Sequence, residues 1–100
     1  MSRQYEEVLP VPGRTAKVVE AVRVLTQGSD SGQIADLFAF LGDAWECVDV
    51  LDHPPRVHMQ SGSRGFTTFE GEWIVRPHPS AYFKLGHREF TERYKPLERN

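Results

Sequence analysis

The sequence predicts an α+β fold, in which a curved antiparallel sheet of about five strands carries one long helix at about 31–41 and one short C-terminal helix at about 87–94. Three observations lead to this class. An apolar stripe runs at helical spacing through the thirties. Short apolar runs separated by glycine- and proline-containing turns fill 45–85. Phe90 and Tyr94 then stand one helical turn apart.

Residues 1–16 are expected to form an N-terminal arm, residues 17–97 a single domain and residues 98–100 a tail. Pro10, Pro12 and Gly13 interrupt any periodicity in the arm. The domain then opens with a valine-rich run at 17–25, and β-branched residues favour a strand there. A helix is the alternative for this run, because four of its apolar residues also fit helical spacing: Val18, Ala21, Val22 and Leu25.

The helix at 31–41 follows from both its ends and its face. Asp30 can cap its start, with Gln33 completing a pattern similar to a capping box. Gly42 stands where a left-handed C-terminal cap is favoured. The stripe that should face the core consists of Ile34, Leu37, Phe38 and Leu41.

The remaining strands are expected at 45–51, 56–60, 66–69, 73–75 and 81–85. Prolines 54 and 55 place a turn between the first two, and alternation directs Val57 and Met59 inward. The final helix should pack Phe90 and Tyr94 on Trp73 or Val75.

Composition indicates a globular protein, with 39% hydrophobic and 26% charged residues. No apolar run is long enough for a membrane span, the first residues do not resemble a signal peptide, and a single cysteine fits a reducing compartment. We therefore expect a cytoplasmic protein without a membrane partner. The net charge is −2, so nucleic acid is not expected as a partner either.

Charge is distributed unevenly along the chain. Residues 24–55 contain six acids and no Lys or Arg, whereas residues 56–100 contain eight bases and five acids. Such a distribution could steer a partner or a second copy of the protein. Charges on solvated surfaces that are unevenly distributed by chance explain it as well.

Residue types that carry chemistry are present but do not form a recognisable site. The spacings of Cys47 and the four histidines do not match those of zinc ligands. Cys47 is expected to be a packed thiol in mid-strand, and Glu70 and Glu72 to be solvated turn residues rather than a hydrolase pair. No metal, cofactor or catalytic residue is therefore expected.

Aromatic residues interleave with arginines in the C-terminal part of the chain. This combination can hold single-stranded nucleic acid, but it also builds the core of a small β domain, which the acidic balance favours. Whether the segment is only core and surface or also a binding site stays open. The candidate binding surface consists of Arg64, Arg76, Arg88 and Arg93.

Four segments resemble, in order, a group of short tailed-phage and prophage proteins of unknown function, the PGDYG-like proteins. The segments are Val19-Glu20-Ala21, Phe40-Leu41-Gly42-Asp43, Gly71-Glu72-Trp73-Ile74-Val75-Arg76 and Phe90-Thr91-Glu92-Arg93-Tyr94-Lys95-Pro96. The resemblance covers 17–97. The sequence departs from the group at Glu70 and Glu72, where the group has proline and aspartate, and at the hairpin that contains Pro77, His78 and Pro79. The resemblance implies an accessory phage protein and no catalytic chemistry.

The functional expectation is a non-enzymatic, protein-binding module of phage or prophage origin, acting in the host cytoplasm. Its partner would be a host protein, a phage protein or a second copy of itself. The alternative is a protein that sequesters a small molecule or nucleotide. A concave pocket rimmed by Arg64, Arg76 or Arg88 would favour this alternative.

Overall fold

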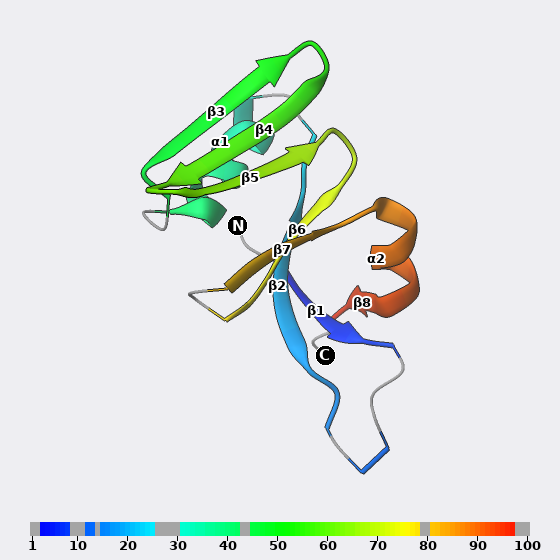
Figure 1. Cartoon of the computed structure of the whole chain (residues 1–100). Coiled ribbons are helices and arrows are strands. Elements are labelled where there is room, and N and C mark those ends of the chain that lie inside the picture. The colour runs from blue at the N-terminus through cyan, green and yellow to red at the C-terminus, as the bar shows by residue number, and fades with distance from the viewer. Residues whose placement is uncertain are drawn as a thin grey trace.

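The computed structural model describes residues 3–8, 12–13, 15–25, 31–42, 45–78 and 81–97. The elements follow in the order β1 (Arg3–Glu7), β2 (Val18–Arg23), α1 (Ser31–Leu41), β3 (Cys47–Asp52), β4 (Pro55–Ser61), β5 (Arg64–Phe69), β6 (Trp73–His78), β7 (Ala81–Leu85), α2 (His87–Arg93) and β8 (Tyr94–Pro96) (Figure 1). The described strands form a five-stranded sheet in the order β7-β6-β2-β1-β8 and a three-stranded sheet in the order β3-β4-β5.

The predicted α+β class is wrong. The protein is mostly β, with eight described strands in two antiparallel sheets instead of about five in one, and its two helices are both short. The helices do lie where they were expected, at Ser31–Leu41 and His87–Arg93. The error therefore concerns the number of strands and how they are divided between sheets.

The division between the sheets occurs at the turn after β5. Glu70 and Gly71 are typical of a hairpin turn, but β5 and β6 do not pair with each other. Instead the Gly71 N–H donates to the Val24 carbonyl over 2.7 Å, and the Val24 N–H donates to the Glu72 carbonyl over 2.8 Å. Gly71 has a φ of +88°, a conformation that glycine adopts without steric cost. The chain thus crosses to the second sheet, where β6 pairs with β2.

Two segments that were not expected as strands complete the five-stranded sheet. Residues 3–7, within the expected arm, form β1 between β2 and β8. Residues 94–96, expected to end the last helix and stop it, form β8. Both are short and polar apart from the buried Tyr5 and Tyr94, so periodicity gives little signal for them.

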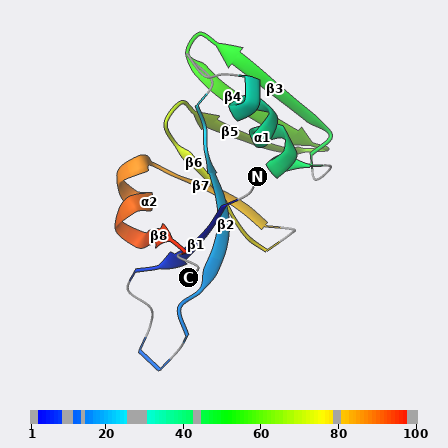
Figure 2. The same ribbon diagram turned by 180° about the vertical axis from the view of Figure 1, so that it is seen from behind.

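The first core lies between the three-stranded sheet, α1 and one face of the five-stranded sheet. Its buried residues are Val24, Leu37, Phe40, Leu41, Trp45, Val57, Met59 and Ile74. Seen from behind, α1 lies over the three-stranded sheet (Figure 2). The inward directions expected for Val57 and Met59 are confirmed.

The helical stripe is rotated relative to the expectation. Phe40 is buried in the first core, whereas Phe38 is 41% exposed. The side chain of Ile34 lies outside the described residues, as does Asp30. Gly42 ends the helix with a φ of +56°, and its N–H donates to the Phe38 carbonyl, as expected of a left-handed cap.

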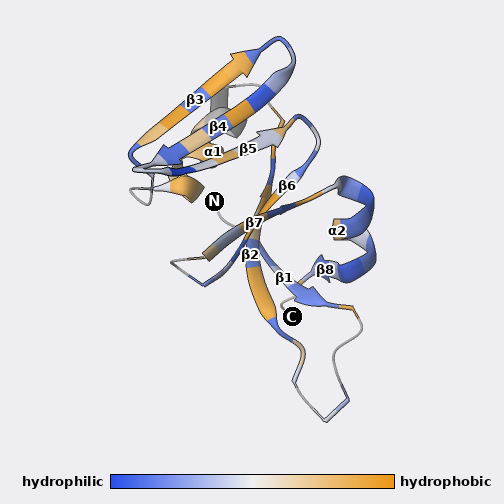
Figure 3. Ribbon diagram, viewed as in Figure 1, coloured by the Kyte–Doolittle hydropathy of each residue, from blue (hydrophilic) through white to orange (hydrophobic). Residues whose placement is uncertain are grey.

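The second core lies on the opposite face of the five-stranded sheet, between the sheet and α2. It consists of Tyr5, Val19, Ala21, Val75, Leu85, Phe90 and Tyr94, with Trp73 and Phe83 against it. The rings of Trp73 and Phe90 stack at 3.9 Å with an interplanar angle of 7°. The expected packing of Phe90 and Tyr94 on Trp73 or Val75 is confirmed, although Tyr94 belongs to β8 and not to the helix. Hydrophilic residues cover most of α2 outside this contact (Figure 3).

The first prediction compares two neighbours on α1. Leu37→Ala should lower the free energy of unfolding by about 2–5 kcal/mol, because Leu37 is buried in the first core. Phe38→Ala should cost less than about 1 kcal/mol, because much of the ring is already in water. Urea unfolding of both variants measures the difference. Equal losses would contradict the observed rotation of the helix.

The second prediction concerns the C-terminal part of the chain. A chain that ends at Gly86 lacks α2 and β8 and leaves one face of the five-stranded sheet uncovered, so we expect cooperative thermal unfolding to be lost. Phe90→Ala should cost about 3–5 kcal/mol in the full chain, and Glu89→Ala, on the exposed side of the same helix, should cost little. A shortened chain that melts as sharply as the full one would refute this role of α2.

Candidate functional site

The three-stranded sheet has one face on the first core and a second face that no described element covers. Alternation places nine residues on this second face, which we call the outer face. Of the two faces, it is the one turned toward the viewer in Figure 1, with α1 behind the sheet. It consists of Cys47, Asp49 and Leu51 from β3, Arg56, His58 and Gln60 from β4, and Gly65, Thr67 and Phe69 from β5.

One row of the outer face combines apolar and cationic groups. Leu51 pairs with Arg56, and Arg56 pairs with Phe69. Leu51 is 37% exposed and Phe69 is 41% exposed, which makes them exposed apolar side chains on the same face. The Nζ of Lys84, from β7, lies 5.6 Å from the centroid of the Phe69 ring. Two accessible apolar groups therefore flank a guanidinium.

The middle row of the outer face is polar and internally hydrogen-bonded. His58 pairs with Asp49 on one side and with Thr67 on the other. Its Nδ1 lies 2.8 Å from the Thr67 hydroxyl and its Nε2 lies 3.3 Å from Oε1 of Gln60. If the Thr67 hydroxyl donates to Nδ1, then Nε2–H donates to the amide oxygen of Gln60. This arrangement fixes the orientation of the imidazole ring on the surface.

Cys47 lies on the outer face and is exposed, so the expectation of a packed thiol is wrong. Its Sγ lies 3.7 Å from Oδ2 of Asp49. Cys47 and Asp49 are two residues apart on one strand and therefore share a face, and the carboxylate requires that face to be solvated. Asp49 was therefore the sequence signal that Cys47, on the same face, is exposed.

Glu70 and Glu72 are both half-buried at the turn after β5, not fully solvated as expected. Glu72 accepts the Phe69 N–H through Oε1 at 2.7 Å, and the same oxygen lies 3.9 Å from Nζ of Lys84. Lys84 in turn donates to the Thr67 carbonyl over 3.0 Å. Glu72 and Lys84 thus hydrogen-bond main-chain groups along the edge of β5 that faces away from β4.

The predicted arginines fall on two parts of the molecule. Arg64 and Arg76 lie at the two ends of one aromatic cluster within the first core, formed by Phe40, Trp45, Phe66 and Tyr82. The guanidinium of Arg64 lies 5.6 Å from the Trp45 ring, and that of Arg76 lies 4.5 Å from the Phe40 ring. The indole N–H of Trp45 has no hydrogen-bond partner among the described residues.

Arg76 joins β6, β2 and the end of α1. Its Nη1 donates to the Phe40 carbonyl over 2.8 Å, and its Nη2 lies 2.9 Å from Oε1 of Glu20. Burial opposes the charge, but hydrogen bonds to Tyr82 and Glu20 outweigh it and raise the pKa of the Arg76 guanidinium above its ordinary value. A cation at this position also satisfies a carbonyl in the last turn of α1.

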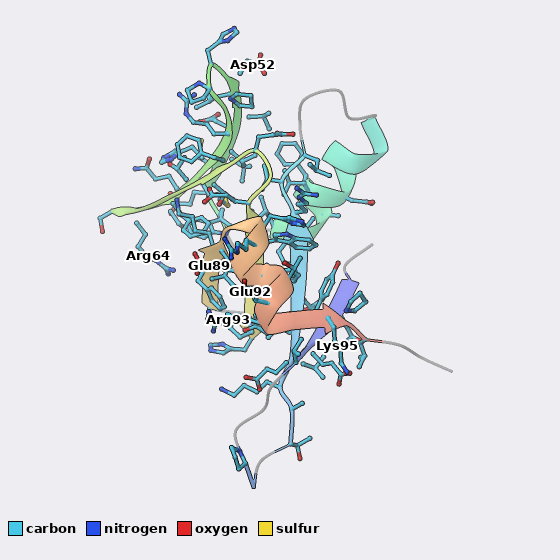
Figure 4. The ribbon with its side chains drawn as sticks, turned by 90° about the vertical axis from the view of Figure 1, so that its right-hand side faces the viewer. Asp52, Arg64, Glu89, Glu92, Arg93 and Lys95 are labelled. Carbon is cyan, nitrogen blue, oxygen red and sulfur yellow. The ribbon has the colours of Figure 1, made fainter. Side chains whose placement is uncertain are left out.

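Arg88 and Arg93 both lie on α2 and both have acidic neighbours. Arg88 forms an ion pair with Glu92 at 3.3 Å, with the two side chains 92% and 64% exposed. Figure 4 shows Arg93 on α2 together with Glu89 and Glu92, and places Asp52 at the opposite end of the molecule from Lys95. Nζ of Lys95 lies 3.6 Å from Oε1 of Glu6. The bases of this half are thus interspersed with acids.

In the described ranges, no three His, Cys, Asp or Glu side chains come together as a possible metal-binding group. His53 lies in the turn between β3 and β4 and His78 ends β6, and both are exposed, whereas His87 accepts the Trp73 indole N–H over 3.1 Å through Nδ1. Sequence reasoning did not single out His58, Thr67, Leu51 or Phe69 as site residues. Alternation along their strands could have grouped them, but the order of the strands could not be read from it.

No protein-family model, no curated protein and no solved structure matches this chain. Neither helix in the described part of the chain has the length and apolar character needed to cross a bilayer.

The third prediction compares two arginines. Arg76→Met should lower the free energy of unfolding by about 1.5–3 kcal/mol, because it removes charged hydrogen bonds to Glu20 and the Phe40 carbonyl. Arg88→Met should change it by less than about 0.5 kcal/mol, since its ion pair is exposed. Denaturant melts of both variants decide the matter. A negligible loss at Arg76 would show that the junction contributes nothing to stability.

Proposed function

We propose that this protein is a non-enzymatic, protein-binding module of phage or prophage origin and that the outer face of the three-stranded sheet contributes its binding surface. One observation carries the proposal: the uncovered face exposes Leu51 and Phe69 on either side of Arg56. Residues of this kind, an aromatic and an arginine within an otherwise polar surface, supply much of the binding energy in protein interfaces. The phage origin rests on the resemblance of residues 17–97 to PGDYG-like proteins.

Electrostatics would contribute mainly to encounter and partner choice. The predicted surface of Arg64, Arg76, Arg88 and Arg93 stays part of the proposal, with Arg64, Arg88 and Arg93 as its exposed members. Exposed charges accelerate association more than they add affinity. Association should therefore weaken as ionic strength rises.

A specific observation favours one alternative, a protein that sequesters a small planar molecule. The exposed guanidinium of Arg64 lies 5.6 Å from the Trp45 ring of the aromatic cluster, and the buried indole N–H of Trp45 has no partner in the described residues. Such groups could bind the base and the anionic part of a nucleotide. Heat of binding upon titration of nucleotides into the protein, lost in Arg64→Met, would support this alternative.

The fourth prediction tests the outer face with two phenylalanines of equal exposure. Phe69 and Phe38 are each 41% exposed, but Phe69 lies on the outer face and Phe38 on α1. A partner cross-linked to the protein in host lysate, and confirmed by binding of the purified partner, should bind Phe69→Ser about tenfold or more weakly. Phe38→Ser should bind like the unsubstituted protein.

Equal binding by both variants would remove the outer face from the proposal. A protein that finds no macromolecular partner but binds nucleotides in the calorimeter would replace the proposal with the sequestering alternative.

A further inference from the structure

The edge of β3 that faces away from β4 is formed by the main-chain groups of Val48 and Val50. This follows from a hydrogen bond at the other side of the sheet, where the Glu70 N–H donates to the Pro55 carbonyl over 3.0 Å. Successive residues of a strand direct their main-chain N–H and C=O groups to opposite sides. The main-chain groups of Val57 and Met59 therefore face β5, as those of Pro55 do, and the main-chain groups of His58 face β3. His58 pairs with Asp49, so the main-chain N–H and C=O groups of Asp49 face β4. Those of Val48 and Val50 therefore face away from β4.

The opposite edge of the same sheet is closed. On β5, the Phe69 N–H donates to Glu72, the Phe69 carbonyl accepts the Glu72 N–H, and the Thr67 carbonyl accepts Nζ of Lys84. Side chains that occupy edge groups in this way prevent another strand from adding. Among the described strands β3 pairs only with β4, and its register is regular over all six residues. The β5 edge of the sheet is thus blocked to an added strand, whereas the β3 edge is a regular strand.

The residues beside the β3 edge are acidic, which favours a basic occupant. Asp49 is exposed in the middle of β3, Glu46 is exposed just before it, and Asp52 ends it. Residues 24–55 contain no Lys or Arg, so β3 itself carries acids but no basic residue, and the nearest base, Arg56, lies on β4, on the side away from this edge. A second copy would bring the same acids to the edge, and like charges opposite each other destabilise strand pairing. Lysine or arginine at alternate positions of a partner strand would instead face Asp49.

We propose that an extended basic segment of a protein partner docks by adding to β3 as a fourth, antiparallel strand of the three-stranded sheet. Main-chain bonds to Val48 and Val50 would give affinity, and basic side chains beside Asp49 would give selectivity. This inference rests on the proposed function and specifies the chemistry of the partner. The added strand would extend the outer face next to Leu51.

The fifth prediction uses a short peptide of alternating lysine and valine as the probe, titrated into isotope-labelled protein. Its lysines should lie beside Asp49, so its valine amides should face β3. We expect the amides of Val48 and Val50 to shift and to gain protection from hydrogen exchange. N-methylation of the valine amides should weaken binding about tenfold or more, because it removes main-chain donors. N-methylation of the lysine amides, which face away, should have little effect.

Two charge reversals complete the experiment. Asp49→Lys should weaken binding of the lysine peptide about tenfold, whereas Glu89→Lys on α2 should not. A glutamate–valine peptide should not bind. The inference is overturned if the lysine peptide leaves Val48 and Val50 unperturbed, or if both N-methylated peptides bind equally. Partner binding that depends on Phe69 but not on Asp49 would also overturn it, while leaving the proposed function in place.

Discussion

Strand β6 has to bury both of its faces, and the architecture follows from this constraint. Ile74 and Val75 are adjacent and completely buried, yet alternation sends them into different cores. Each face of the five-stranded sheet therefore requires a cover. The first face is covered by α1 and the three-stranded sheet, and the second by α2. The run Trp73-Ile74-Val75 is apolar without alternation because neither of its sides meets bulk water.

Arg76 marks the end of this doubly buried segment. It lies on the same face of β6 as Ile74, where the first core ends against the C-terminal turn of α1. A hydrophobic residue there would remove the Arg76 hydrogen bonds to the Phe40 carbonyl and to the Glu20 carboxylate. The guanidinium satisfies both and lies over the rings of Phe40 and Tyr82 with its apolar faces. It therefore fixes how α1 is placed against β2 and β6.

Local signals predicted most elements but not their assembly. The helix at 31–41 was predicted at its observed position from spacing and Gly42, but spacing alone could not decide between Phe38 and Phe40, because both adjoin Leu37 on the helix surface. The phase of the stripe is set by the three-stranded sheet, whose position depends on the crossing at Gly71. The candidate site was less predictable. Its residues become one surface only when β3, β4 and β5 pair in register, which the linear pattern does not encode.

The insertion of residues 31–69 between β2 and β6 has an evolutionary consequence. These two strands are far apart in sequence but pair directly, from Glu20 with Arg76 to Arg23 with Trp73. The intervening helix and three strands therefore leave and rejoin the five-stranded sheet at neighbouring points. A lineage can replace this whole excursion with another that covers Val24 and Ile74, without altering the sheet beneath it. Exchange of this one continuous segment would therefore leave the pairing of β2 with β6 intact.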